Sequence, residues 1–227
     1  MTLLPTRTLS WRDRRRARRT SLSAGEVPVA LRGGGTAFLR PLQPGETGPL
    51  LDVFEQLSPA SRLSRYLVGL PSLPRTMATA LVDVDGCRHV AWLATVDDRA
   101  AGIARVVRTG SATAEVAFEV ADRHQGRGLG TALLDAVTTV AAARGVRRLE
   151  ATALPDNDSS VHLLRRLGLV WVASGGLLEG SGALQLLDPA RVDRRAVLAL
   201  SDQRREVSRR SASAVAFGAV EPVPAPC

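Results

Sequence analysis

The sequence predicts an α+β protein whose mixed, mostly antiparallel central sheet is flanked by helices in a single domain. Three observations predict this class. Strand-like segments follow one another through tight connections, the apolar spacing then changes from a strand period to a helical one, and a strand, a helix and further strands complete the pattern. Because a strand–helix–strand order is typical of a crossover, part of the sheet is expected to be parallel.

The first half of the expected domain is a short strand followed by helices. Residues 37–42 fit a strand that is stopped by proline. The apolar residues between 50 and 57 have helical spacing. Ser58-Pro59 resembles an N-cap with proline at the first helical position, so a second helix is expected to follow, and residues 74–82 fit a third short one.

The second half of the domain is expected to be rich in strands. Three hairpin-linked strands, which form an antiparallel meander, are expected over residues 90–96, 102–107 and 114–120. The apolar spacing from 129 to 141 predicts a helix that ends at Arg144-Gly145. A strand, a helix and a closing hairpin around Gly180 are expected last, over residues 146–154, 156–167, 169–172 and 183–187.

The 227-residue chain is long enough for one well-packed domain with tails. We expect a disordered, arginine-rich leader over 1–35, the folded domain over 36–188, and a basic, then Ala/Pro-rich and mostly disordered tail over 189–227. All 30 basic residues are Arg, and the net charge of +8 divides into +6 for the leader, −1 for the domain and +3 for the tail. The leader is either a solvated segment or an arm that binds polyanions.

Composition argues against several classes of function. No apolar run approaches the ~18 residues of a transmembrane helix and no secretory signal is evident, so we expect a cytoplasmic setting without a membrane partner. The two cysteines and three histidines lack the spacing of zinc ligands, so no metal is expected. No aromatic residues interleave along a basic face, which argues against a nucleic-acid partner.

The most informative segment is Gln125-Gly126-Arg127-Gly128-Leu129-Gly130-Thr131, which lies between an expected strand and an expected helix. Glycines there let the backbone approach a ligand closely. The first amides of the following helix have no intrahelical partner and point outward at the positive end of the helix dipole, which suits a diphosphate. The side chain of Arg127 either adds a charged contact or is solvated. A glycine-rich turn without a ligand is the other interpretation.

Two other nucleotide-binding motifs do not fit this segment. A dinucleotide fingerprint requires Gly-x-Gly-x-x-Gly after the first strand of a parallel sheet, whereas this loop follows an expected meander. A P-loop requires a lysine, and the sequence contains none.

Over residues 36–188 the sequence resembles the GNAT superfamily of acetyl-CoA-dependent N-acetyltransferases. Gln125, Gly128 and Gly130 match the family signature Gln/Arg-x-x-Gly-x-Gly/Ala, and Leu154-Pro155-Asp156-Asn157 before a helix ending in Gly-Leu resembles its second motif. Two further segments are similar to bacterial protein-lysine acetyltransferases of the Pat type, namely Ala114-Glu115-Val116-Ala117-Phe118 and Ser58-Pro59-Ala60-Ser61-Arg62. The resemblance implies the GNAT fold, acetyl-CoA as cosubstrate and an amine as acceptor.

The resemblance also implies which residues contact acetyl-CoA. The strand before the loop would face the pantetheine arm, the loop would hold the diphosphate, and the start of the later helix would approach the arm from the other side. The residues expected to make these contacts are Phe118, Glu119, Val120, Gln125, Gly126, Arg127, Gly128, Leu129, Gly130, Thr131, Asn157 and Ser160.

A carboxylate beside the site can take the proton that the attacking amine loses. Glu115 and Glu119 share one face of an extended strand, so the pattern makes both of them candidates. The resemblance selects Glu115 as the general base. Leu164 stands where many members of the family carry a tyrosine as general acid. Water or another group would then protonate the leaving thiolate, which leaves fairly well unaided because a thiol has a pKa near ~8.5.

Three functions remain open at this point. The first is acetyl transfer to an amine, such as a protein lysine. The second is acetyl transfer to a small-molecule amine on the same fold, and the third is a non-catalytic acyl-CoA-binding sensor module. The acceptor cleft is expected around residues 45–85 and 174–182, whose shape the sequence does not reveal.

Overall fold

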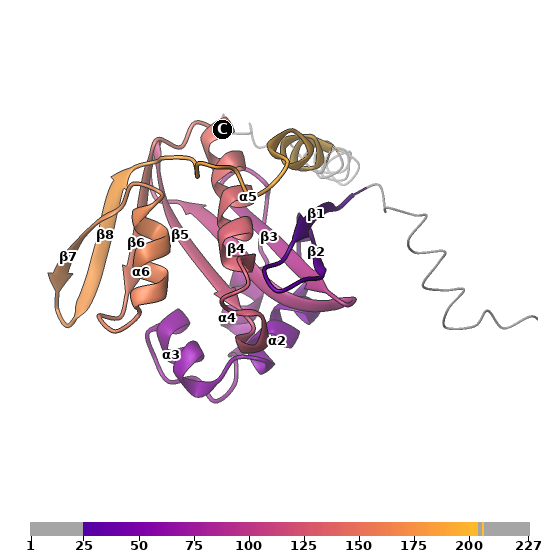
Figure 1. Cartoon of the computed structure of the whole chain (residues 1–227). Coiled ribbons are helices and arrows are strands. Elements are labelled where there is room, and N and C mark those ends of the chain that lie inside the picture. The colour runs from indigo at the N-terminus through magenta and orange to yellow at the C-terminus, as the bar shows by residue number, and fades with distance from the viewer. Residues whose placement is uncertain (1–24, 204–205, 207–227) are drawn as a thin grey trace, which may run out of the picture.

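An eight-stranded sheet forms the centre of the protein, and helices cover both of its faces (Figure 1). The computed structural model describes residues 25–203 and 206. Within them the strand order is β1-β2-β3-β4-β5-β6-β8-β7. Every neighbouring pair is antiparallel except β5 and β6, which run parallel. This arrangement confirms the expected α+β class and the mixed, mostly antiparallel sheet.

The strands follow the order of the chain from β1 to β6, and β8 then lies between β6 and β7. β3, β4 and β5 are consecutive antiparallel neighbours, which confirms the expected meander. The strands are β1 (Val27–Ala30), β2 (Thr36–Pro41), β3 (His89–Val96), β4 (Arg99–Arg108), β5 (Thr113–Val120), β6 (Arg148–Ala153), β7 (Val170–Ser174) and β8 (Leu177–Ala183).

The helices begin close to the expected positions. The Ser58 hydroxyl accepts a 3.2 Å hydrogen bond from the Ser61 amide, and Pro59 occupies the first helical position, so the expected N-cap is confirmed. Residues 194–203 form a last helical segment. The other helices are α2 (Thr47–Glu55), α3 (Pro59–Tyr66), α4 (Arg75–Leu81), the 3₁₀ turn η1 (Asp122–His124), α5 (Leu129–Ala143) and α6 (Asp158–Arg165).

Each face of the sheet packs against its own apolar core. α5 covers one face, whereas α2 and α4 cover the other. Successive residues of β3 alternate between the cores, so Trp92 packs on the α5 side and Leu93 on the α2 side. Because both faces are covered, β3 and β4 are apolar along most of their length. These two layers hold β5 and the start of α5 in a fixed relation.

The folded region extends beyond both expected boundaries. β1 pairs with β2 before the expected start at Thr36, and Val27 and Val29 are buried in the core. Beyond the expected end at residue 188, Val192 and Val197 are also buried in the core that contains α5. The limits 36 and 188 were therefore too narrow. The remaining leader and tail residues, 1–24, 204–205 and 207–227, lie outside the described part of the chain.

The closing hairpin differs from the expected one. Its second strand is β8, Leu177–Ala183, rather than residues 183–187, and its turn is Gly175-Gly176. Both glycines have positive φ angles, 56° and 82°, as a two-residue hairpin turn requires. Gly180, expected at the turn, instead lies inside β8, where a Cβ would come within 2.8 Å of the Trp171 ring.

β5 and β6 diverge, and this divergence positions the site. Only Thr113–Glu115 of β5 pair with β6, although β5 continues to Val120. The backbone of residues 116–120 therefore has no strand partner on the β6 side.

None of the helices formed by residues 25–203 and 206 is both long and apolar enough to span a membrane.

Candidate functional site

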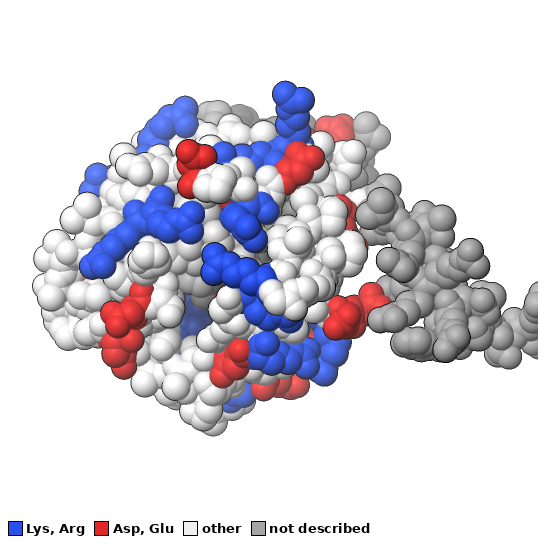
Figure 2. Space-filling model, viewed as in Figure 1, with Lys and Arg blue, Asp and Glu red and all other residues white. Residues whose placement is uncertain are grey.

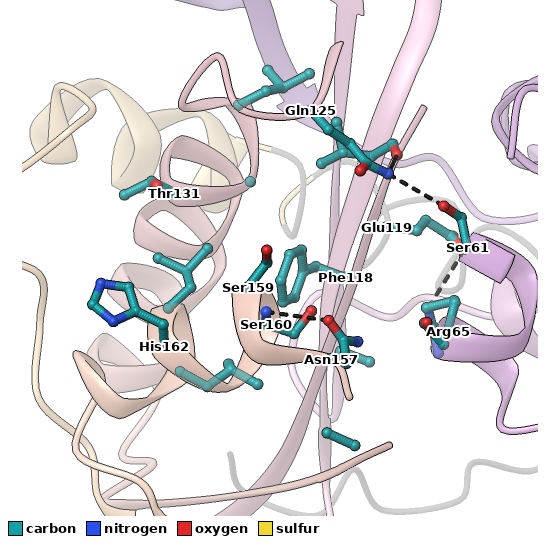
Figure 3. Close-up of a pocket in the computed structure, with 18 of the residues that line it drawn as sticks. Ser61, Arg65, Phe118, Glu119, Gln125, Thr131, Asn157, Ser159, Ser160 and His162 are labelled. Atoms are coloured by element: carbon teal, nitrogen blue, oxygen red, sulfur yellow. Dashed lines mark hydrogen bonds and ion pairs between the residues drawn. The ribbon is translucent and has the colours of Figure 1, made fainter. Parts of the chain in front are cut away.

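A cavity of about 730 Å³ opens where β5 and β6 separate. Its walls come from β5, from the loop that follows it, from the start of α5, from α6 and from α3 (Figure 3). Segments distant in the sequence thus contribute side chains to one hollow. The lining includes Glu115, near the point where the strands part, and Thr131 on α5.

The loop before α5 presents bare backbone amides to the cavity. Gly126 and Gly128 have positive φ angles of 71° and 85°, which glycine adopts without strain. Gly128 is the N-cap of α5, and no side chain caps the helix there. The first intrahelical bond from this end runs from the Ala132 amide to the Gly128 carbonyl, so the preceding amides are free to bind an anion.

The Gln125 side chain braces this loop. Its amide nitrogen donates to the Val120 carbonyl at 3.1 Å, to a carboxylate oxygen of Asp122 at 3.1 Å and to the Ser61 hydroxyl at 3.4 Å. These contacts connect the end of β5, the η1 turn and α3. Gln125 therefore shapes the site by holding its walls together.

Arg127 contacts the connection between β1 and β2. Its side chain is absent from the cavity lining and donates to the Gly34 carbonyl at 2.6 Å and to the Arg32 carbonyl at 3.4 Å. The Arg32 amide in turn donates to the Arg127 carbonyl at 3.0 Å. The Arg127 side chain thus fastens the β1–β2 connection to the loop, and its contact with a ligand stays a prediction.

The two candidate glutamates of β5 occupy different environments. Glu115 is exposed and lines the cavity. Glu119 is 4% exposed and lies 3.4 Å from Arg105 and 3.5 Å from Arg65. It also accepts a 2.8 Å hydrogen bond from the Tyr66 hydroxyl. Glu119 is therefore a buried, ion-paired carboxylate, whereas Glu115 is accessible to a substrate.

Burial shifts the pKa values of Tyr66 and Arg105, which both contact Glu119. It raises the pKa of Tyr66 well above its usual value, and the negative charge of Glu119 raises it further. Burial also lowers the pKa of Arg105 to about 10, although the attraction of Glu119 opposes this change. At neutral pH the phenol stays protonated and the guanidinium stays charged, so Glu119 keeps both partners.

The start of α6 forms the opposite wall. Asn157 caps this helix, since its side-chain oxygen accepts a 3.3 Å hydrogen bond from the Ser160 amide (Figure 3). The capping bond uses the oxygen of Asn157 and leaves its NH₂ group as a donor. Leu164 also lines the cavity and is buried, so an apolar side chain occupies that part of the wall.

The structure brings nearly all expected site residues to the same cavity. Apart from Arg127, the lining includes Glu115, Phe118, Glu119, Val120, Gln125, Gly126, Gly128, Leu129, Gly130, Thr131, Asn157 and Ser160. Sequence reasoning missed Tyr66, Arg65 and Arg32, which also line it. The only available signal was the polar face of the Arg-rich helix α3, which carries the single tyrosine of the sequence.

Metal ligands do not converge at this site. Among the described residues no group of three or more His, Cys, Asp or Glu side chains is placed to hold a metal ion. His124 lies beside the loop, where burial and then the charges of Arg123 and Arg127 lower its pKa. Arg123 and Arg127 thus place positive charge beside the loop.

Comparisons with known proteins agree on one family. Residues 58–169 match the model of the GNAT acetyltransferase family. Acetyltransferase Pat of Mycolicibacterium smegmatis is 36% identical over 150 residues, which are 64% of this chain and 45% of that protein. The chain thus spans less than half the length of this curated relative.

Solved structures show the same fold. The GNAT domain of S. lividans PAT superposes with a TM-score of 0.65 at 31% identity, covering 70% of this chain and 97% of that domain. The Salmonella typhimurium protein yncA, solved with acetyl-CoA, superposes with a TM-score of 0.52 at 19% identity, covering 68% of this chain and 97% of yncA. The latter likeness concerns the fold alone.

Proposed function

The chain belongs to the GNAT family of acetyltransferases, and we propose that it transfers an acetyl group from acetyl-CoA directly to a primary amine, with Glu115 as the general base. The observation that carries this proposal is the cavity between the diverging strands. It has free helix amides at one end and an exposed carboxylate near the other. A phosphate-bearing thioester carrier and an amine require these two features together.

The lining residues fit the parts of acetyl-CoA. The amides at the start of α5 suit the diphosphate, because they are unpartnered and lie at the positive end of the helix dipole. On the side that faces β6, the backbone of residues 118 and 119 has no strand partner and can hydrogen-bond the amide groups of the pantetheine arm. The NH₂ group of Asn157 offers a further donor from the opposite wall.

The reaction needs a neutral amine next to the thioester carbonyl. The amine nitrogen attacks this carbon, its proton passes to the Glu115 carboxylate directly or through a water, and the C–S bond breaks to release the CoA thiolate. Glu119 is less suited to this role, because it is buried and its carboxylate oxygens are engaged by Arg65, Arg105 and Tyr66. Leu164 has no proton to donate, so the thiolate takes one from water.

A protein lysine is the acceptor that we favour, because two segments of the sequence are similar to protein-lysine acetyltransferases of the Pat type. Acetyl transfer to a small-molecule amine uses the same site and chemistry. A sensor that binds acyl-CoA without turnover would keep the loop and need no accessible base, whereas Glu115 is exposed in the cavity.

The test uses the full chain, radiolabelled acetyl-CoA and a cell lysate. Label in lysate proteins that survives denaturation would support transfer to protein amines, and label in small molecules alone would support the second acceptor class. The chain has no lysine, so it cannot accumulate label on lysine side chains of its own. Binding of acetyl-CoA by calorimetry without any transfer would support the sensor, and the absence of binding would overturn the proposal.

A further inference from the structure

Two arginines from opposite ends of the folded chain meet over the loop before α5. Arg32 lies in the β1–β2 connection, and Arg191 lies in the segment after β8. A Cβ atom placed on Gly128 would lie 3.4 Å from Nη2 of Arg191 and 4.0 Å from Nε of Arg32. Both residues are outside residues 58–169, which match the family model. The two flanking segments therefore reach the N-cap of α5 from outside the matched region.

Specific contacts hold both arginines there. The Arg32 amide donates to the Arg127 carbonyl at 3.0 Å, and the Arg127 side chain donates back to the Gly34 carbonyl at 2.6 Å. Asp135 of α5, which is fully buried, accepts a 2.5 Å hydrogen bond from the Arg191 amide. Backbone bonds thus fix the positions of Arg32 and Arg191 and leave their guanidinium groups unused.

Neither guanidinium has a counter-charge among the described residues. Within residues 25–203 and 206, no hydrogen bond or ion pair engages the side chain of Arg32 or Arg191. By contrast, Arg194, from the same segment as Arg191, pairs with Asp135 at 2.7 Å. The face shown in Figure 2 carries several Arg side chains across its centre, with Asp and Glu side chains above and below them.

This arrangement favours an anion at the loop. Two guanidinium groups beside the positive end of a helix dipole repel each other and the dipole unless a negative charge lies between them. The nearby His124 has a pKa that is lowered by burial and by Arg123 and Arg127, so the surroundings already disfavour a further positive charge. Arg32 also lines the cavity, which places one of the free guanidinium groups at the opening that a ligand would use.

We propose that Arg32 and Arg191 bind phosphate oxygens at the nucleotide end of the acyl carrier, so that the two flanking segments complete the carrier site. This inference rests on the proposed function. Guanidinium groups suit phosphates because their N–H donors match two oxygens at once. Coenzyme A offers a diphosphate and a 3′-phosphate as partners of this kind. The flanking segments then select nucleotide carriers over thioesters of bare pantetheine.

The test compares coenzyme A binding by calorimetry for the full chain and its Arg32→Ala and Arg191→Ala variants. We expect each substitution to raise the Kd for coenzyme A by roughly tenfold, as for the loss of one charge-assisted hydrogen bond. Added salt should reduce this difference between the variants and the wild type. Arg195→Ala is the matched control, because Arg195 is an exposed arginine of the same segment and has no atom within 4 Å of a Cβ placed on Gly128. Thermal unfolding without ligand verifies that all variants fold.

Two truncated ligands identify the partner. If the substitutions weaken dephospho-CoA binding as much as coenzyme A binding, the arginines contact the diphosphate. If they weaken coenzyme A binding alone, the arginines contact the 3′-phosphate. Both results support the proposal, and pantetheine should bind the variants and the wild type alike. Coenzyme A affinities unchanged by either substitution would overturn it. Failure of the wild type to bind coenzyme A at all would instead overturn the proposed function.

Discussion

The hydroxyl of Tyr66 donates a 2.8 Å hydrogen bond to Oε2 of Glu119, and this contact joins α3 to the strand that forms the cavity wall. We predict that Tyr66→Phe lowers the free energy of unfolding by about 1–2 kcal/mol, because one hydrogen bond to a buried carboxylate is lost. Urea unfolding followed by circular dichroism measures this change.

Glu119→Gln should cost more than Tyr66→Phe, about 3–5 kcal/mol, because it leaves Arg105 buried without its counter-charge. Equal losses for the two variants would show that the ion pairs of Glu119 contribute little beyond the hydrogen bond from Tyr66.

Glu115 should carry the proton transfer. We predict that Glu115→Gln slows acetyl transfer by ~10²–10⁴-fold, because the amide keeps the shape of the side chain but cannot accept a proton. The affinity for coenzyme A should be unchanged, since the amides that suit the diphosphate lie at the other end of the cavity. Steady-state rates together with calorimetry separate the two effects. A rate within twofold of wild type would remove Glu115 from this role.

The sequence predicts those parts of the site that depend on local pattern. The glycine spacing and its place before a helical period predict the loop, and Ser58-Pro59 predicts the start of α3. Alternation places Glu115 and Glu119 on one strand face but cannot separate them, because the difference comes from partners distant in the sequence. Only tertiary packing brings Arg105 and Tyr66 to Glu119.

Weak or unusual local signals account for the missed boundaries. β1 has four residues and pairs with β2 alone at the sheet edge, so its alternation of buried and exposed residues is too short to be recognised in the sequence. Asp135 interrupts the apolar side of α5, and such a residue requires a partner when it is buried. That partner is the segment around Arg191 and Arg194, which a tail of disordered residues would not provide.

Gly128 and Gly130, at the start of α5, should respond differently to alanine. Gly128 has a φ of +85°, so Gly128→Ala strains the backbone by about 1 kcal/mol or more and adds a methyl group beside Arg191. We predict a loss of coenzyme A affinity of roughly tenfold. Gly130 has no positive φ, and a Cβ there would lie 3.2 Å from the Phe118 ring and 3.6 Å from Val120. Gly130→Ala is therefore the matched control, with a smaller loss, and calorimetry on both variants distinguishes them.

Stability should fall on acidification below the usual histidine pKa. Burial lowers the pKa of His89, with a further contribution from Arg105, and burial and two arginines lower that of His124. The unfolded chain therefore takes up protons at about pH 6.5, where the folded chain resists them, so stability decreases as the pH falls through that value.

Urea unfolding at several pH values between 5 and 8 tests this dependence. A double variant, His89→Gln with His124→Gln, should show a weaker dependence than the wild type across the same range. The same dependence of stability on pH in both proteins would assign the effect to carboxylates instead.

Bound coenzyme A should also raise the pKa of His124, because the phosphate charge offsets the neighbouring arginines. NMR titration of His124 with and without coenzyme A measures this change.

Asp135 links the last segment of the fold to the carrier site. Its carboxylate accepts from the amides of Arg191 and Val192 and from the Arg194 guanidinium, and its side chain is fully buried. We predict that Asp135→Ala lowers the free energy of unfolding by about 3 kcal/mol, since these donors lose their partner. It should also weaken coenzyme A binding as Arg191→Ala does, because Arg191 is no longer held over Gly128.

Asp202→Ala is the control for this prediction. Asp202 is exposed and pairs with Arg144, so its removal should cost at most about 1 kcal/mol and leave coenzyme A affinity unchanged. Hydrogen exchange adds an independent measurement, since Asp135→Ala should speed exchange of the amides in residues 191–203 more than in α2. Loss of stability with undiminished coenzyme A affinity would show that the last segment supports the fold without contributing to the site.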